Sequence, residues 1–251
     1  MINPMTLEGK TILITGASDG IGKETALLAS KLGAKIILVA RSEEKLRNTM
    51  DTLEGKGHRW YSFDLKEIDK IESLIKNVVT ENGALDGFVH CAGISTMRPL
   101  KNTNHDFLQE MMLINFYSFV ELTRLITKKG NYNKGMSIVA MSSIGGIRGD
   151  KSKTAYSSSK AALDGAIRSM SKELGAKNIR VNSIVSGIIK TDMFKRFMEK
   201  TGKDEFDSQF DKYILGLGVT EDVANAIAFL LSDASRIITG TGLVIDSGAT
   251  T

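Results

Sequence analysis

The stretch TGASDGIG, residues 15–22, decides the fold class of this chain. It follows the apolar run Thr11–Thr15 and leads into a segment rich in Ala and Leu, which predicts a strand, a turn and a helix in succession. Glycines at positions 16, 20 and 22 allow a tight turn, close approach of the backbone to a pyrophosphate, and close packing of helix on strand. The helix N-terminus offers unpaired N–H groups to phosphates. The stretch therefore predicts the first β-α unit of a dinucleotide-binding domain.

Short apolar runs recur beyond this unit, with helical stretches between them, which is typical of β-α units winding a parallel sheet. Most runs are nearly continuously apolar, as strands covered by helices on both faces must be. We therefore predict an α/β fold of the Rossmann type: a single domain with a doubly wound, seven-stranded parallel sheet and helices on both faces. The predicted strands are Thr11–Thr15, Lys35–Ala40, Trp60–Asp64, Gly87–His90, Met136–Ser142, Arg180–Val185 and Gly242–Asp246.

Two helix starts and one buried helix face can also be predicted. Ser42 and Thr220 each precede two acidic residues, so each hydroxyl is predicted to cap a helix whose first turn carries the acids. The apolar residues within 71–78 recur at helical spacing and are predicted to face the core; they are Ile71, Leu74, Ile75 and Val78.

The composition argues against several function classes. The net charge of +4 comes from Lys and Arg spread among nearly as many acids, so we expect no nucleic-acid partner. A single cysteine, Cys91, and three scattered histidines give no support to a disulfide framework or a metal site. No stretch resembles a signal peptide or a bilayer-spanning helix, so we expect a cytoplasmic protein without a membrane partner.

The segment 188–218 interrupts the β-α pattern. It is mixed in charge yet carries several aromatic residues, which makes it too apolar for a linker. Two interpretations stay open: a mobile flap over a substrate site, or a peripheral pair of helices. No repeat or linker marks a second domain, so we assign residues 1–251 to one domain, with 188–218 as its candidate substrate flap.

Candidate catalytic residues follow the predicted fifth strand. Tyr156 and Lys160 fall one turn apart on one helix face, where an ammonium would stabilise a phenolate and lower the pKa of Tyr156. Such a phenol can act as a general acid or base. Ser142 and Ser143 end the strand, at the sheet edge where open α/β folds bind ligands, and one of them can hydrogen-bond a reacting oxygen.

The end of the second strand bears on the choice of cofactor. Ala40 and Arg41 stand where a dinucleotide site that prefers NAD carries an acid for the ribose hydroxyls. The neutral residue removes a repulsive charge, and the arginine can bind a 2′-phosphate. We therefore expect NADP(H) to be preferred, with NAD(H) still accepted. Asp19 adds an acid to the glycine loop, so Arg41 is expected to carry most of the discrimination, assisted by Ser18.

Together these residues resemble the short-chain dehydrogenase/reductase family over essentially the whole chain. Ser143 lies 13 residues before Tyr156, as the catalytic serine of that family does, which selects it over Ser142. The chain departs from the family pattern at His90-Cys91, Ser186 and Ser247. The matching positions, in family order, are the glycine pattern at 15–22, Asp64, Ala92-Gly93, Asn115, Ser143, Tyr156 with Lys160, and Gly187 with Thr191.

The resemblance implies roles for these residues. Asn115 would interrupt its helix and hold a water that feeds a proton relay through Lys160. Lys160 would also bind the nicotinamide ribose. Asp64 would meet the adenine, and Ile189 with Thr191 would contact the carboxamide. The implied catalytic residues are Asn115, Ser143, Tyr156 and Lys160. The implied cofactor-binding residues are Gly16, Ser18, Asp19, Gly20, Ile21, Gly22, Arg41, Asp64, Leu65, Ala92, Gly93, Tyr156, Lys160, Gly187, Ile189 and Thr191.

The predicted function is an NADP(H)-dependent oxidoreductase that interconverts a ketone and a secondary alcohol. In length and C-terminal region the chain most resembles 3-oxoacyl-carrier-protein reductases. Lys134 and Lys177 fall where those enzymes place basic residues that dock the acidic carrier. The substrate is thus a small-molecule or carrier-bound carbonyl, and a homo-oligomer, dimer or tetramer, is expected. Sugar, polyol or steroid dehydrogenation stays open, as does a non-catalytic nucleotide-sensing regulator on the same fold. A sugar-nucleotide epimerase or dehydratase is disfavoured by the glycine spacing.

Overall fold

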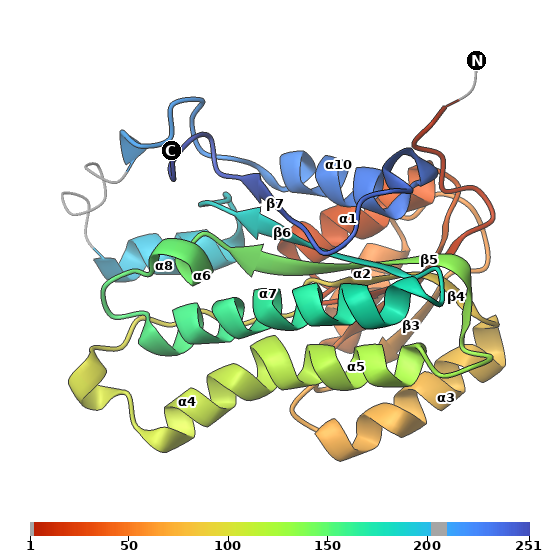
Figure 1. Ribbon diagram of the computed structural model, residues 1–251, viewed down its shortest axis with the longest axis horizontal. Helices are drawn as coiled ribbons and strands as arrows, with labels where there is room; N and C mark the ends of the chain where they lie inside the picture. The colour runs from red at the N-terminus through yellow and green to blue at the C-terminus, as the bar shows by residue number, and fades with distance from the viewer. Residues whose placement is uncertain (1–2, 202–209) are drawn as a thin grey trace.

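Seven parallel strands form one sheet in the order β3-β2-β1-β4-β5-β6-β7, which confirms the predicted single-domain, doubly wound fold (Figure 1). The structure, a computed structural model, describes residues 3–201 and 210–251. The chain winds outward from β1 to β3 and then returns to place β4 on the other side of β1. Ligands of open α/β sheets bind at the carboxyl edge of such a reversal. The strands are β1 (Thr11–Thr15), β2 (Lys35–Ala40), β3 (Arg59–Ser62), β4 (Leu85–His90), β5 (Tyr132–Ser143), β6 (Arg180–Ser186) and β7 (Gly242–Ile245).

All seven predicted strands are present, two with the predicted bounds and the others with shifted ends. Strands β1 and β2 have the predicted bounds. Strand β3 ends at Ser62, so Asp64 follows the strand instead of ending it. Strand β5 begins at Tyr132, because this residue pairs with Leu85 across an irregularity that precedes the apolar run. The extra residues there are polar and mostly exposed, which the apolar pattern could not reveal.

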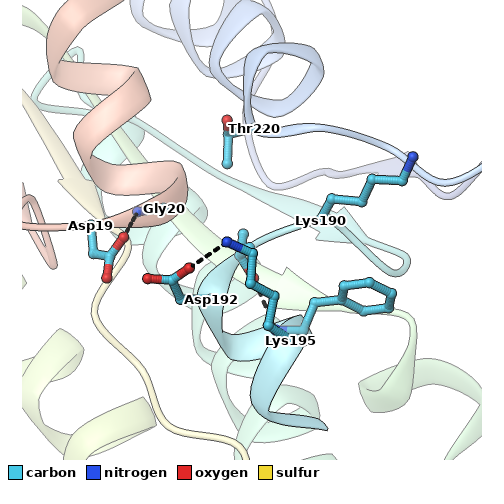
Figure 2. Close-up of a pocket in the computed structure, with 8 residues that line it drawn as sticks. Asp19, Gly20, Lys190, Asp192, Lys195 and Thr220 are labelled. Carbon is cyan, nitrogen blue, oxygen red and sulfur yellow. Dashed lines mark hydrogen bonds and ion pairs between the residues drawn. The ribbon is translucent and has the colours of Figure 1, made fainter. Parts of the chain in front are cut away.

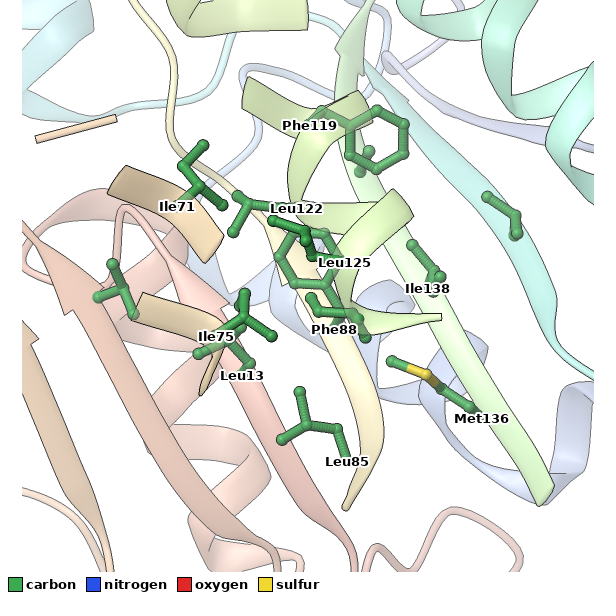
Figure 3. Close-up of a cluster of buried hydrophobic side chains, with 14 of the residues drawn as sticks. Leu13, Ile71, Ile75, Leu85, Phe88, Phe119, Leu122, Leu125, Met136 and Ile138 are labelled. Atoms are coloured by element: carbon green, nitrogen blue, oxygen red, sulfur yellow. The ribbon is translucent and has the colours of Figure 1, made fainter. Parts of the chain in front are cut away.

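Helices cover both faces of the sheet because successive strand residues point to opposite sides. In β1, Leu13 faces one apolar cluster, whereas Ile12 and Ile14 face the other. Figure 3 shows the first cluster, in which Phe88 of β4 stacks on Phe119 with ring centroids 6.2 Å apart. The helices over this cluster are α3 (Ile71–Asn82), α5 (Ser118–Ile126) and α7 (Thr154–Gly175); those over the other are α1 (Gly20–Lys31), α2 (Glu43–Met50) and α10 (Thr220–Leu231).

Shorter helices lie between these elements. Helix α4 (His105–Met112) continues through a π-helical turn, η3 (Leu113–Tyr117), into α5. Two helices follow the carboxyl ends of strands, α6 (Gly145–Arg148) after β5 and α8 (Asp192–Thr201) after β6. Among the described residues there are also three single turns of 3-10 helix: η1 (Ile68–Lys70), η2 (Leu100–Asn102) and η4 (Asp233–Ser235).

One predicted helix cap is confirmed and the other is wrong. The Ser42 side chain accepts a hydrogen bond from the Lys45 N–H and caps α2, as predicted. Helix α10 begins at Thr220 itself, after Val219, and the Asp222 carboxylate accepts from the Val219 N–H at 2.8 Å. The side-chain hydrogen bond at this helix end is therefore made by the Asp222 carboxylate and not by the Thr220 hydroxyl. The helix face within 71–78 is buried throughout, as predicted.

No helix among residues 3–201 and 210–251 combines the length and the apolarity that crossing a bilayer requires.

Candidate active site

The glycine loop between β1 and α1 is packed backbone against backbone. A Cβ on Gly22 would lie 2.3 Å from the carbonyl oxygen of Gly16, and one on Gly16 would lie 2.7 Å from the amide nitrogen of Ala92. Gly16 also has a φ of +69°, which L side chains rarely adopt. These two glycines therefore let the loop, the start of α1 and the loop after β4 meet. Ser18 and Ile21 lie half-buried in the same loop.

The N-terminus of α1 is capped by an acid. Asp19 accepts a hydrogen bond from the Gly20 N–H at 2.8 Å and forms an ion pair with Lys45 of α2 at 3.0 Å. Thr191, from the segment between β6 and α8, has its methyl group 3.5 Å from where a Cβ of Gly20 would lie. Figure 2 shows the pocket between them, of about 320 Å³, lined by Asp19, Gly20, Lys190, Thr191, Asp192, Phe194, Lys195 and Thr220.

The end of β2 presents a cation without a neighbouring acid on the strand. Arg41 is exposed, and its carbonyl oxygen accepts a hydrogen bond from Ser62 at 2.9 Å, which ties the strand end to β3. Asp64 is half-buried and accepts from the Lys66 N–H, while Leu65 is buried. These predicted adenine-side residues therefore lie together at the carboxyl ends of β2 and β3.

The predicted catalytic residues converge where β5 meets α7. Ser143 ends β5, accepts a hydrogen bond from the Gly145 N–H at 3.1 Å, and hydrogen-bonds the Tyr156 hydroxyl. Lys160 is buried, its Nζ donates to the carbonyl oxygen of Met141 at 2.7 Å, and it lies 5.8 Å from the centroid of the Tyr156 ring. Strand and helix thus bring the three side chains to one place.

The electrostatics of this cluster correct one expectation. Burial raises the pKa of Tyr156; the Ser143 hydrogen bond opposes this rise and the Asp150 charge adds to it. Burial also lowers the pKa of Lys160 to about 8, against the opposing effects of Asp164 and Cys91. The lowered pKa predicted for Tyr156 is therefore wrong for the chain by itself. The reason is that the ammonium of Lys160 is turned toward the carbonyl of Met141 and does not offset the desolvation of the phenol.

Asn115 lies in the π-helical turn η3, so it does interrupt its helix. Its side chain is buried and clamps the loop after β4: Oδ1 accepts from the Ile94 N–H at 2.8 Å, and Nδ2 donates to the Ile94 carbonyl at 3.0 Å. The Nδ2 group also lies 3.0 Å from Ser159 Oγ, one residue before Lys160. Asn115 therefore joins the loop that carries Ala92 and Gly93 to the catalytic helix. Its predicted water-holding role stays a prediction.

The two ends of the segment 188–218 are joined by contacts that were not predicted from the sequence. Ile189 pairs with Gly218, and the buried Tyr213 accepts a hydrogen bond from the Ile188 N–H at 3.2 Å. Gly187 packs on the Tyr213 ring: a ring carbon of Tyr213 lies 2.8 Å from where a Cβ of Gly187 would be. Residues 202–209 lie outside the described residues, so the predicted flap stays a prediction for this segment.

Two residues near the site belong to no sequence motif and were not predicted from the sequence. Asp150 follows α6, and its Oδ2 lies 3.5 Å from where a Cβ of Gly145 would be, beside Ser143 and Tyr156. Lys45 reaches the glycine loop from α2. Neither stands at a diagnostic spacing from the motifs, because only the folded chain brings them close.

The departure at His90-Cys91 leaves the strand end intact. His90 is buried and bonded to the Thr15 hydroxyl at 2.9 Å, and burial lowers its pKa to about 3, so the ring is neutral. Burial raises the pKa of the Cys91 thiol to about 12. Both side chains are therefore uncharged at neutral pH, and they join β4 to β1 and α1. Within the described ranges, no cluster of His, Cys, Asp or Glu could hold a metal ion.

The residues present fit a nicotinamide dinucleotide. The glycine loop leaves no room for side chains where α1 begins, and Gly93 keeps the space beside Asn115 and Lys160 open, since a Cβ there would lie 3.2 Å from Asn115 Oδ1. The pocket at the N-terminus of α1 joins the loop to Thr191. Backbone N–H groups, hydroxyls and the Lys160 ammonium are the donors that phosphates and ribose hydroxyls require.

Comparisons with known proteins agree with this geometry. A family model described as Enoyl-(Acyl carrier protein) reductase matches residues 16–250. The chain is 34% identical to the 3-oxoacyl-(acyl-carrier-protein) reductase FabG of Thermotoga maritima over 247 residues, which cover 97% of this chain and 99% of that protein. Its identity to FabG of Rickettsia felis is 36% over 244 residues, or 96% of this chain and 97% of that protein.

A solved structure is similar over nearly the same range. A short-chain type dehydrogenase/reductase from Mycobacterium ulcerans has a TM-score of 0.90 at 30% identity, and the match covers 97% of this chain and 90% of that one. Fold, site geometry and relatives lead to one conclusion. The chain belongs to the short-chain dehydrogenase/reductase family and is an NAD(P)-dependent oxidoreductase.

Proposed function

We propose that the protein reduces a ketone to a secondary alcohol with NADP(H), and that Ser143, Tyr156 and Lys160 perform the chemistry. The convergence of these three side chains carries the proposal: Ser143 hydrogen-bonds Tyr156, and the Lys160 ammonium lies against the face of the Tyr156 ring. Lys160 also stands beside Gly93, with its Nζ 3.6 Å from where a Cβ of Gly93 would lie.

Each residue has a distinct task. The bound cofactor supplies a hydride from its nicotinamide ring. Ser143 donates a hydrogen bond to the carbonyl oxygen of the substrate and so orients it. Tyr156 donates its proton to the same oxygen, and its raised pKa keeps that proton in place at neutral pH. Lys160 keeps its ammonium bonded to the Met141 carbonyl and over the face of the Tyr156 ring, and Asn115 binds the adjoining loop through the Ile94 backbone.

The substitution Tyr156→Phe tests this assignment. It removes the proton-donating oxygen and keeps the ring, so we expect turnover to fall about 100-fold or more while cofactor binding persists. Steady-state kinetics measure the first quantity and fluorescence titration with NADPH the second. A variant with turnover close to that of the wild type would refute the catalytic role.

The preference for NADP(H) over NAD(H) rests on Arg41. The guanidinium is exposed at the end of β2, and this strand end offers no carboxylate to bind the ribose hydroxyls. A charge-assisted hydrogen bond contributes about 1.5 to 3 kcal/mol, so a preference of roughly ten- to a hundredfold is expected. The ratio of kcat/KM for the two cofactors, in wild type and in Arg41→Ala, measures it. A ratio that does not change in the variant would remove Arg41 from this role.

A 3-oxoacyl group on an acyl carrier protein is our proposed substrate, supported by the names of the relatives. Lys134 and Lys177 lie side by side, since the Gly135 N–H donates to the Asn178 carbonyl at 3.1 Å. Lys134 lies in β5 near its amino end and Lys177 precedes β6, whereas Ser143 ends β5 at the opposite edge. A carrier docked there is therefore remote from the catalytic residues of the same chain.

A turnover screen decides among the substrate classes. It compares a carrier-bound 3-oxoacyl group, a short thioester analogue, and sugar, polyol and steroid alcohols, each with both cofactors. Docking at the two lysines predicts that Lys134→Glu with Lys177→Glu impairs the carrier-bound substrate alone, and more strongly at low salt. Equal loss on both thioesters would refute docking there.

The cytoplasmic location and the homo-oligomer also remain predictions; light scattering measures the latter.

A further inference from the structure

Lys45, in the first turn of α2, reaches across to the glycine loop. Its Nζ lies 3.0 Å from Asp19 Oδ2, although the two residues are 26 positions apart in the chain. The other carboxylate oxygen of Asp19 accepts from the Gly20 N–H. Asp19 thus ties a cation of α2 to the N-terminus of α1. Both side chains remain about half exposed, at 53% for Lys45 and 43% for Asp19, so a ligand can reach the pair.

Arg41 precedes Lys45 by four residues, at the junction between β2 and α2. It immediately precedes Ser42, whose hydroxyl caps the helix by accepting from the Lys45 N–H at 3.3 Å. Arg41 and Lys45 therefore flank one capped turn, opposite a glycine loop whose residues 15–22 include no Lys or Arg. The other cation of this helix, Arg47, pairs with Glu43 at 2.6 Å and is directed elsewhere.

We propose that Lys45 is a specificity-determining residue that binds the 2′-phosphate of NADP(H) together with Arg41, and that Asp19 holds Lys45 until the phosphate takes over its ammonium. The proposal rests on the proposed use of NADP(H). An ammonium and a guanidinium both make charge-assisted hydrogen bonds to phosphate oxygens. A phosphate with close to two charges attracts the ammonium more strongly than the single charge of Asp19 does. The Asp19 carboxylate itself repels the phosphate.

The test compares two ligands that differ only in the 2′-phosphate, adenosine 2′,5′-bisphosphate and adenosine 5′-monophosphate, by isothermal titration calorimetry. We expect Lys45→Gln to weaken the bisphosphate about tenfold and to leave the monophosphate unchanged. Asp19→Asn keeps a capping side chain but removes the charge, so it should bind the bisphosphate more tightly than wild type. Arg47→Gln removes one charge from the same helix and should change neither affinity.

The outcomes separate this inference from the proposed function. A wild type that binds both ligands equally would overturn the preference for NADP(H) and this inference with it. A wild type that prefers the bisphosphate, with Lys45→Gln and Arg47→Gln equally unaffected, would overturn the role of Lys45 alone. Weaker bisphosphate binding by Asp19→Asn would also overturn it, because Asp19 would then contribute to the bound state.

Discussion

The two ends of the cofactor site are built in different ways. At the nucleotide end, backbone packing around Gly16 and Gly22 shapes the loop, and the side chains proposed to face the ligand, Arg41 and Lys45, are exposed. At the catalytic end, Lys160 and Asn115 are buried and bonded to the backbone of β5 and of the loop after β4. Exposed charges are screened by water and buried ones are not. We therefore expect substitutions at the nucleotide end to change the cofactor preference by modest factors. Substitutions at the catalytic end should remove most of the turnover.

The largest effect is expected from Lys160→Met. The change removes the buried ammonium beside Tyr156 and keeps an unbranched chain of similar length. We expect turnover to fall about 100- to 10000-fold, the range of a lost acid-base contribution, whereas Arg41→Ala affects only the cofactor ratio. Steady-state kinetics with NADPH measure it. A loss no larger than that of Arg41→Ala would show that the two ends do not differ as described.

The lowered pKa of Lys160 predicts that the free energy of unfolding depends on pH. Burial lowers the pKa of Lys160 to about 8 in the folded chain, from 10.5 for an ordinary lysine. Between these two values the unfolded chain binds the extra proton, so the free energy of unfolding rises with pH across this window, by on the order of 3 kcal/mol. Below pH 8 the cost of burying the charge is present in full.

Urea unfolding of wild type and Lys160→Met at pH 7 to 10.5 measures this rise. The variant lacks the group, so the difference between the two curves isolates its contribution. Parallel curves would mean that Lys160 keeps its ordinary pKa and that the catalytic end is no less solvated than the nucleotide end.

A third test concerns the backbone packing of the nucleotide end. In Gly22→Ala the new Cβ would meet the Gly16 carbonyl oxygen at 2.3 Å, so the loop must shift, and we expect a loss of about 1 to 3 kcal/mol in stability with weaker cofactor binding. Gly175→Ala is the matched control, because nothing lies within 4 Å of a Cβ at this helix end. It should be neutral or slightly stabilising. Similar melting temperatures for both variants would argue against a packed glycine loop.

The smallest effect is expected from Asp150→Asn. Burial and the Asp150 charge both raise the pKa of Tyr156, so removing this charge lowers the pKa toward its ordinary value. Reduction needs the protonated phenol, so the alkaline limb of the pH profile should move to lower pH. The pH profile of kcat/KM measures the shift, with Lys151→Gln, an exposed neighbour, as control. A limb that moves to higher pH would contradict the sign.

The sequence alone was sufficient to predict the parallel sheet, the glycine loop and the residues Ser143, Tyr156 and Lys160. Apolar periodicity reports burial of a strand or helix face directly, and the spacing of Tyr156 and Lys160 lies within one helical turn. Apart from the choice of Ser143 over Ser142, which rested on the family resemblance, these features depend on local chain geometry. The bounds of β3 and β5 were harder to predict because their ends are polar, and there strand pairing, not burial, decides where a strand stops.

Only the tertiary structure decided which distant groups meet. The Lys45–Asp19 pair, the position of Asp150 beside Ser143, and the Asn115 clamp on Ile94 each join residues from separate elements. Nor could the raised pKa of Tyr156 be predicted from its spacing to Lys160, because spacing does not say that the ammonium turns to the Met141 carbonyl while the phenol is desolvated. Local pattern fixes which groups are available, but burial and partner choice set their charge state, and both are properties of the packed chain.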